Sequence, residues 1–171
     1  MLLKDIKLPF PNKIKVYAFV GPSGTGKSYR AQMVASEKNI SYIIDDGLLI
    51  RENEVIAGES AKKAETKVAT VKHALFYEEK EREPIIKALK KYRAESILIL
   101  GTSDGMVQKI AANLGLPEIS ETVYITDVAT EEEMKTARRI RVTEGKHVIP
   151  VPTFEIKKDF SRIFARPTSN F

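Results

Sequence analysis

Residues 21–28 read Gly-Pro-Ser-Gly-Thr-Gly-Lys-Ser. The apolar run Lys-Val-Tyr-Ala-Phe-Val precedes this stretch at residues 15–20, and residues 29–35 follow with the pattern of a helix. In the order strand, glycine-rich turn, Lys-Ser and helix, successive backbone N–H groups can curl around an anion, and the helix N-terminus adds its positive dipole end. The stretch therefore predicts a phosphate-binding turn.

The eight residues match the Walker A motif without a gap, and here the chain resembles the P-loop NTPase superfamily. The resemblance implies that Lys27 reaches the terminal phosphates of a nucleotide and that the Ser28 hydroxyl ligates Mg²⁺. The sequence does not fix the preferred base, since no guanine-specificity motif such as N-K-x-D occurs, and ATP is taken as the default nucleotide. We expect the nucleotide to contact the motif and the residue after it, namely Gly21, Pro22, Ser23, Gly24, Thr25, Gly26, Lys27, Ser28 and Tyr29, although Tyr29 would alternatively pack its helix onto the sheet.

Length and composition are those of one globular domain. The chain has 171 residues, of which 43% are hydrophobic and 30% charged. We therefore expect a single P-loop nucleotide-binding domain over residues 1–171, with an N-terminal extension at 1–14, where a short edge strand is conceivable, and a basic, aromatic tail at 154–171. The net charge of +5 favours anionic partners. With no cysteine and no apolar run of the ~20 residues that a membrane helix needs, we expect a cytoplasmic location.

Strands and helices alternate along the chain. Continuous apolar runs predict core strands near residues 15–20, 40–44, 96–100, 122–126 and 147–151, with helices between them. Residues 48–51 and 54–57 predict a small hairpin. We expect an α/β fold of the P-loop type, a three-layer sandwich whose five-stranded, mainly parallel sheet has helices on both faces.

Helix boundaries follow from spacing and capping residues. Ala61, Ala64, Val68, Val71 and Leu75 recur at the spacing of an amphipathic helix, and Pro84 ends that helix or starts the next. Residues 130–133, Thr-Glu-Glu-Glu, form a capping box that predicts a further helix start.

A P-loop needs an acid near Mg²⁺, and three aspartates are candidates. Asp45 fits best because it ends the apolar run 42–44, Asp127 is a weaker match, and Asp104 comes four residues after the strand at 96–100. In P-loop kinases, which the chain resembles here, the strand order is usually 2-3-1-4-5. Asp45 would then lie two strand spacings, about 10 Å, from the P-loop strand. That spacing predicts no direct Mg²⁺ ligation by Asp45, but a role at an acceptor hydroxyl or a water-bridged metal.

The residues after the third core strand are polar. Thr102 and Ser103 either cap the following helix or contact the terminal phosphate, since a polar residue here resembles the sensor-type position of AAA+ ATPases. No arginine-finger box or C-terminal helical lid supports that family, and among enzymes we favour a resemblance to P-loop kinases. In that reading Asp104 or Thr102 acts through a metal-bound water.

Basic residues supply further candidates. Between the second and third core strands, where P-loop kinases carry an acceptor-binding insert, Lys63, Lys67 and His73 could face an anionic acceptor or form a solvated helix face. Arg138 and Arg139 could contact the nucleotide or compensate a helix C-terminus.

Together these patterns predict a Mg-ATP-binding protein with phosphoryl-transfer or hydrolysis chemistry, most simply a small-molecule or nucleotide kinase-like enzyme. The alternatives are a regulatory ATP-binding switch acting through a protein partner, for which the tail is the candidate docking segment, and a nucleic-acid-associated ATPase. The expected catalytic residues are Lys27, Asp45, Asp46 and Asp104, the expected metal ligands are Ser28, Asp45 and Asp104, and Thr102, Arg138 and Arg139 join the nucleotide site.

Overall fold

The computed structural model describes Phe10 and residues 13–144, without several side chains of the last helix. The strand expected at 147–151, the tail at 154–171 and most of the extension at 1–14 lie outside the described residues. The elements follow in the order β1 (Lys15–Val20), α1 (Lys27–Glu37), β2 (Tyr42–Asp45), β3 (Leu48–Arg51), β4 (Glu54–Gly58), the 3₁₀ helix η2 (Ala61–Lys63), α2 (Lys67–Ala74), α3 (Glu79–Lys91), β5 (Ser96–Gly101), α4 (Asp104–Asn113), β6 (Ile119–Tyr124), α5 (Ile125–Val128) and α6 (Glu131–Glu144).

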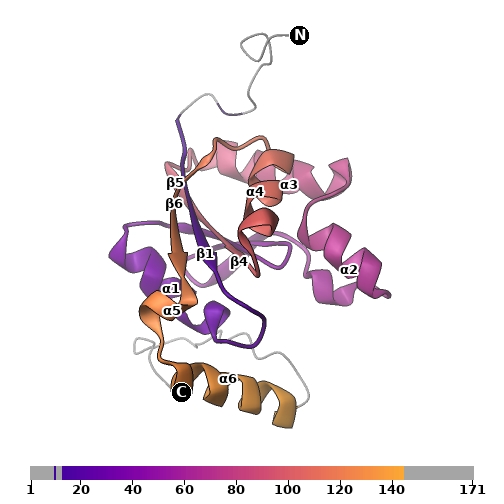
Figure 1. Cartoon of the computed structure of the whole chain (residues 1–171). Coiled ribbons are helices and arrows are strands. Elements are labelled where there is room, and N and C mark those ends of the chain that lie inside the picture. The colour runs from indigo at the N-terminus through magenta and orange to yellow at the C-terminus, as the bar shows by residue number, and fades with distance from the viewer. Residues whose placement is uncertain (1–9, 11–12, 145–171) are drawn as a thin grey trace.

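One sheet of six strands organises the described chain, in the order β4-β3-β2-β5-β1-β6 (Figure 1). Strands β2, β5, β1 and β6 are mutually parallel, while β3 and β4 form the expected hairpin and extend the sheet antiparallel beyond β2. The P-loop strand β1 thus lies between β5 and β6, and β2 is one strand further out, as the order 2-3-1-4 predicts. The α/β fold of the P-loop type is confirmed.

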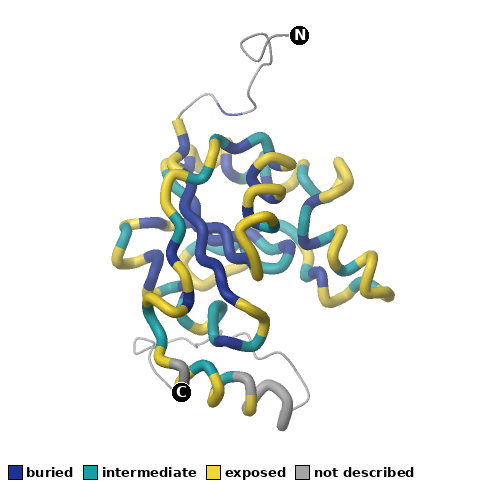
Figure 2. The backbone as a smooth tube through the Cα atoms, viewed as in Figure 1, coloured by how far each residue is buried: buried dark blue, intermediate teal, exposed yellow. Residues whose placement is uncertain are grey.

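Both faces of the sheet are covered, because neighbouring residues of a strand point to opposite faces. On one face Val16, Ala18 and Val20 of β1 join a cluster with residues of α3 and α4. On the other face Tyr17 and Phe19 pack with residues of α1 and α5. Figure 2 shows the central strands as the most buried part of the molecule. With both faces covered, we expect a ligand site at the carboxyl ends of the parallel strands.

Helix α2 differs from the prediction in what it buries. The expected helix over 61–75 is divided into η2 and α2, and Val68 and Val71 are 65% and 57% exposed instead of facing the core. The prediction of one amphipathic helix with a buried apolar face was therefore wrong here. Only Ala61 of η2 and Ala74 of α2 are buried.

Two element boundaries were also wrong, and local capping explains each. Strand β6 ends at Tyr124, because the Asp127 carboxylate accepts the Tyr124 N–H at 2.9 Å and starts the short helix α5. Helix α3 begins at Glu79, well before Pro84, because Glu78 and Glu81 form a capping box. The capping box predicted at Thr130–Glu133 is confirmed, with both hydrogen bonds present.

Candidate nucleotide site

The turn between β1 and α1 has the backbone of an anion cradle. Gly24 and Gly26 have φ angles of 77° and 93°, in the left-handed region that glycine adopts without strain. Gly26 is the N-cap of α1, and as a glycine it has no side chain that could cap the first N–H groups of that helix. A helix start with uncapped N–H groups is an anion-binding site.

Side chains of the motif hold the turn in shape. The Thr25 hydroxyl, which is 2% exposed, donates to the Pro22 carbonyl at 2.6 Å. The Lys27 ammonium donates to the carbonyls of Gly21 at 2.6 Å and Pro22 at 3.1 Å. Lys27 therefore lies along the rim of the turn, where phosphate oxygens would compete for the same N–H donors.

Asp45 lies much nearer the P-loop than strand spacing predicted. Strand β2 lies two strands from β1, as expected, but the Ser28 hydroxyl donates to Oδ2 of Asp45 at 2.7 Å, so the carboxylate contacts the P-loop helix despite that separation. The reason is that Ser28 belongs to the first turn of α1, which lies at the same edge of the sheet as the carboxyl end of β2. Burial raises the pKa of Asp45, against the opposing effects of the Ser28 hydrogen bond and of the Lys62 and Lys27 charges.

Asp46 meets a different set of partners. Its backbone has a φ of 56°, and Oδ2 accepts from Nζ of Lys62 at 2.6 Å and from the Ser60 hydroxyl at 3.3 Å. The two neighbouring aspartates thus divide their contacts, Asp45 with the P-loop helix and Asp46 with the segment that follows β4.

A single cleft of about 1480 Å³ joins these groups. The P-loop from Ser23 onward forms one wall, and Tyr29, Asp45, Asp46 and Thr102 line it with residues of η2, α2, α4 and α6. Tyr29 is 39% exposed, so it belongs to the cleft wall more than to the packing between helix and sheet. Ser103 also lines the cleft, and as the N-cap of α4 its hydroxyl accepts the Met106 N–H at 3.2 Å.

Thr102 and Asp104 are therefore separated by the Ser103 cap. Thr102 faces the cleft, and its N–H and hydroxyl approach the Met106 sulfur at 3.4 and 3.5 Å. Asp104 is exposed, accepts the Tyr124 hydroxyl at 2.9 Å and is not among the cleft-lining residues. The geometry does not bring Asp104 to Ser28, and Asp127 is committed to the start of α5.

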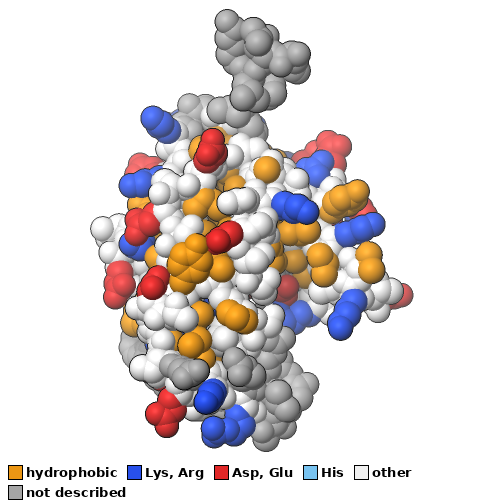
Figure 3. Space-filling model, in the orientation of Figure 1, with side chains coloured by type: hydrophobic (Ala, Val, Ile, Leu, Met, Phe, Trp, Pro, Cys, Tyr) orange, Lys and Arg blue, Asp and Glu red, His pale blue; other side chains and the backbone are white. Residues whose placement is uncertain are grey.

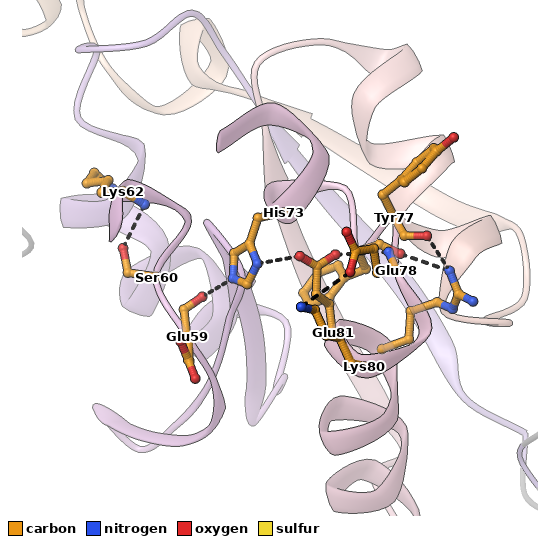
Figure 4. Close-up of polar contacts among 10 residues, drawn as sticks. Glu59, Ser60, Lys62, His73, Tyr77, Glu78, Lys80 and Glu81 are labelled. Atoms are coloured by element: carbon orange, nitrogen blue, oxygen red, sulfur yellow. Dashed lines mark hydrogen bonds and ion pairs between the residues drawn. The ribbon is translucent and has the colours of Figure 1, made fainter. Parts of the chain in front are cut away.

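The basic candidates of the insert do not gather at the cleft. Lys63 and Lys67 are exposed and outside the cleft lining, whereas Lys62, which the sequence analysis did not single out, lines it. His73 is half-buried and is not among the residues that line the cleft, so it does not face the place of a substrate. Figure 4 shows its ring between two acceptors, with Nδ1 2.7 Å from Glu81 Oε2 and Nε2 2.6 Å from the Glu59 carbonyl.

Helix α6, which carries the expected nucleotide contacts Arg138 and Arg139, lines the cleft through other residues, namely Glu132, Glu133, Thr136 and Ala137. Glu133 pairs with Arg30 of α1 at 3.1 Å, and Ala137 lies 3.6 Å from where a Cβ on Gly26 would stand. Arg139 is exposed and outside the cleft lining, and the side chain of Arg138 lies outside the described residues. The capping box at Thr130 was the available signal for where this wall begins.

Comparison with known proteins places the chain in a family. Residues 17–115 match the AAA family, described as ATPase family associated with various cellular activities. The matched stretch is more than half of the chain, so the chain belongs to this family, a P-loop NTPase family. A search of the curated proteins returned no match. Among the described residues, no helix is long and apolar enough to cross a membrane.

Membership of this family makes the chain a P-loop ATPase, a class that binds and hydrolyses ATP. It confirms the P-loop NTPase resemblance. The chain belongs to the AAA family, although the absence of an arginine-finger box and of a C-terminal lid had counted against AAA+ proteins. The kinase-like type of phosphotransfer receives no support from the match.

Proposed function

We propose that this chain hydrolyses Mg-ATP in the cleft between the P-loop and the ends of β2 and β5. The observation that carries the proposal is the hydrogen bond from Ser28 to Asp45, at 2.7 Å, with Asp46 as the next residue. It pairs a hydroxyl at the helix start with a carboxylate, and a second carboxylate follows at the same edge of the sheet. Hydrolysis needs a group that helps to bind the metal ion and a group that orients the attacking water, and the two carboxylates can fill these roles.

The turn fits a nucleoside triphosphate. Its left-handed glycines and uncapped helix start provide N–H donors for phosphate oxygens, and Lys27 already donates along the same rim. Gly21 has no room for a side chain, since a Cβ there would lie 2.5 Å from Ile125 Cγ2. In this reading the motif binds the phosphates, and Tyr29 and α6 contact the remainder of the nucleotide.

Ser28 and Asp45 fit a magnesium ion held jointly with phosphates. No cluster of three or more His, Cys, Asp or Glu side chains suited to a metal occurs among residues 10 and 13–144. Mg²⁺ commonly takes one or two protein ligands, with waters and phosphate oxygens completing its octahedron. Ser28 would be the direct ligand, and Asp45 would orient the hydroxyl and balance the charge. The ion would supply charge neutralisation at the transferred phosphoryl group.

Asp46 and Thr102 take the remaining roles. Asp46 orients the attacking water, because its carboxylate follows the metal-side Asp45 and lines the same cleft. Thr102 lies at the end of β5, between the P-loop strand and β2, where its hydroxyl can donate to a terminal phosphate oxygen. Asp104 has no part in this proposal.

The insert between β2 and β5 favours water, and not a small-molecule acceptor, as the group that attacks the terminal phosphate. The two lysines proposed for an anionic acceptor, Lys63 and Lys67, are outside the cleft lining. Part of the insert forms the β3–β4 hairpin, which extends the sheet and does not line the cleft. These features support hydrolysis over transfer to a small molecule.

Phosphate release measured with and without acceptors tests the proposal. We expect Mg²⁺-dependent release of inorganic phosphate from ATP at a rate unchanged by a panel of nucleosides, sugars and small metabolites. Turnover that requires one of these acceptors, with the phosphate recovered on it, would overturn hydrolysis in favour of a kinase.

A regulatory ATP switch is the second candidate, favoured by the exposed face of α2. Val68, Val71 and the nearby Tyr77 are each more than half exposed, and Val71 also lines the cleft. Figure 3 shows hydrophobic and Lys or Arg side chains together over the region of α2. Tight ATP binding with negligible turnover would support this candidate over the ATPase. Nothing in the described chain favours a nucleic-acid-associated activity over these two.

A further inference from the structure

Lys62 reaches the cleft from outside the motifs. It lies in η2, in the segment that links the β3–β4 hairpin to α2, and its Nζ contacts Asp46 Oδ2 at 2.6 Å. Within the described chain, no hydrogen bond to Oδ1 of Asp46 is present. One carboxylate oxygen of Asp46 is therefore held by a cation while the other can accept a hydrogen bond from water.

The segment that carries Lys62 is fastened to Asp46 at several points. The Ala61 N–H donates to the Asp46 carbonyl at 2.9 Å, and Ser60, which caps η2, also donates to Oδ2. The residue before this cap, Glu59, is held through its carbonyl by His73 of α2 (Figure 4). The segment is thus anchored on both its sides, which fixes the place from which Lys62 extends.

A carboxylate after the end of a strand has rotational freedom unless neighbours restrict it. Asp46 lies beyond β2 in a left-handed backbone conformation, and it is half-buried. The Lys62 ammonium and the Ser60 hydroxyl both bind Oδ2, so together they select one side-chain orientation. Holding a catalytic group in one orientation lowers the barrier of the step that uses it.

We propose that Lys62 is a positioning residue for ATP hydrolysis, holding the Asp46 carboxylate by Oδ2 so that Oδ1 faces the attacking water. This inference rests on the proposed function, because it presupposes that Asp46 orients the water. Lys62 acts through Asp46 and does not contact the reacting atoms.

Steady-state hydrolysis of Mg-ATP by the full chain tests the role in a double-mutant cycle. Lys62→Ala should lower kcat about ten- to a hundredfold with little change in KM, because the ground-state contacts to the nucleotide remain. Lys62→Arg should restore most of the rate, since it keeps a cation within reach of Oδ2. Once Asp46→Asn is present, Lys62→Ala should add no further loss, because the group it positions is gone.

Lys63→Ala is the matched control, because Lys63 is the next residue of the same 3₁₀ helix, is exposed and lies outside the cleft lining. Its kcat should equal that of the wild type. An unchanged or increased kcat for Lys62→Ala, or losses that multiply in the double variant, would overturn the positioning role while leaving hydrolysis intact. A wild-type chain without turnover would instead remove the proposed function, and this role with it.

Discussion

Asp45 and Asp46 are adjacent in the chain but have different surroundings. Asp45 accepts the Ser28 hydroxyl at the start of α1, whereas Asp46 accepts Lys62 and Ser60 from the segment after β4. Two carboxylates held by different partners are suited to different tasks, one at the metal and one at the water.

Removing the charge of Asp45 should weaken metal binding more than nucleotide binding. In Asp45→Asn the hydroxyl of Ser28 loses its carboxylate partner, so we expect Mg²⁺ affinity in the presence of nucleotide to fall about ten- to a hundredfold. Titration of Mg²⁺ against ATP hydrolysis measures this change. Asp104→Asn is the control, since that exposed carboxylate contacts Tyr124 and lies outside the cleft lining. Equal Mg²⁺ requirements in the two variants would contradict the metal-side role of Asp45.

Gly21 shows how tightly the P-loop is packed. In Gly21→Ala the new Cβ would lie 2.5 Å from Ile125 Cγ2 and 2.8 Å from Ile125 Cβ, within a buried cluster. We expect a loss of about 1–3 kcal/mol in the free energy of unfolding, measured by urea denaturation. Gly105→Ala is the matched control, because a Cβ there has no neighbour within 4 Å. This second variant should be neutral or slightly stabilising in α4, and equal losses in both would show that packing at Gly21 is not the cause.

At the scale of elements, one imidazole joins three of them. His73 of α2 lies between the Glu59 carbonyl, after β4, and the Glu81 carboxylate in the first turn of α3. Burial opposes charge on His73, but these two acceptors outweigh it and raise the pKa above its ordinary 6.5. Burial likewise opposes charge on Glu81, but the Glu78 N–H and His73 lower the pKa of Glu81 below 4.5.

The ionic clamp, by which we mean the contacts of His73 with Glu81 and with the Glu59 carbonyl, should therefore stabilise the protein in a limited pH window. The contribution of His73 is complete below pH 6.5 and is lost as the pH rises through its raised folded-state pKa. The contribution of Glu81 is complete above pH 4.5 and is lost as the pH falls through its lowered folded-state pKa. The Tm difference between wild type and His73→Gln should be greatest between these values and shrink on the alkaline side. A difference independent of pH would contradict the ionic clamp.

Elements were predictable wherever a local signal dominated. The P-loop strand, turn and helix, the hairpin and the capping box at Thr130 all follow from residues adjacent in sequence. Predictions erred where a tertiary or competing local contact decided the outcome. Asp127 ended β6 early by capping α5, and Val68 and Val71 kept helical spacing without gaining a core to face.

For the whole molecule, the sheet order was predictable and the site distances were not. Placing β5 between β1 and β2 follows from the strand order of P-loop proteins, and the structure has that order. The contact between Ser28 and Asp45 depends on the direction in which α1 leaves the P-loop, which spacing between strands does not contain. Lys62 was missed for a similar reason, since nothing in its sequence context distinguishes it from the neighbouring exposed Lys63.

Isothermal titration of Mg-ATP into the full chain tests whether the turn from Gly21 to Ser28 binds the phosphates of ATP. Lys27→Ala should weaken binding about ten- to a hundredfold, because a charge-assisted contact to phosphate contributes about 1.5–3 kcal/mol. Lys63→Ala, which removes one exposed lysine outside the cleft lining, should bind as the wild type does. Unchanged affinity in Lys27→Ala would contradict the account.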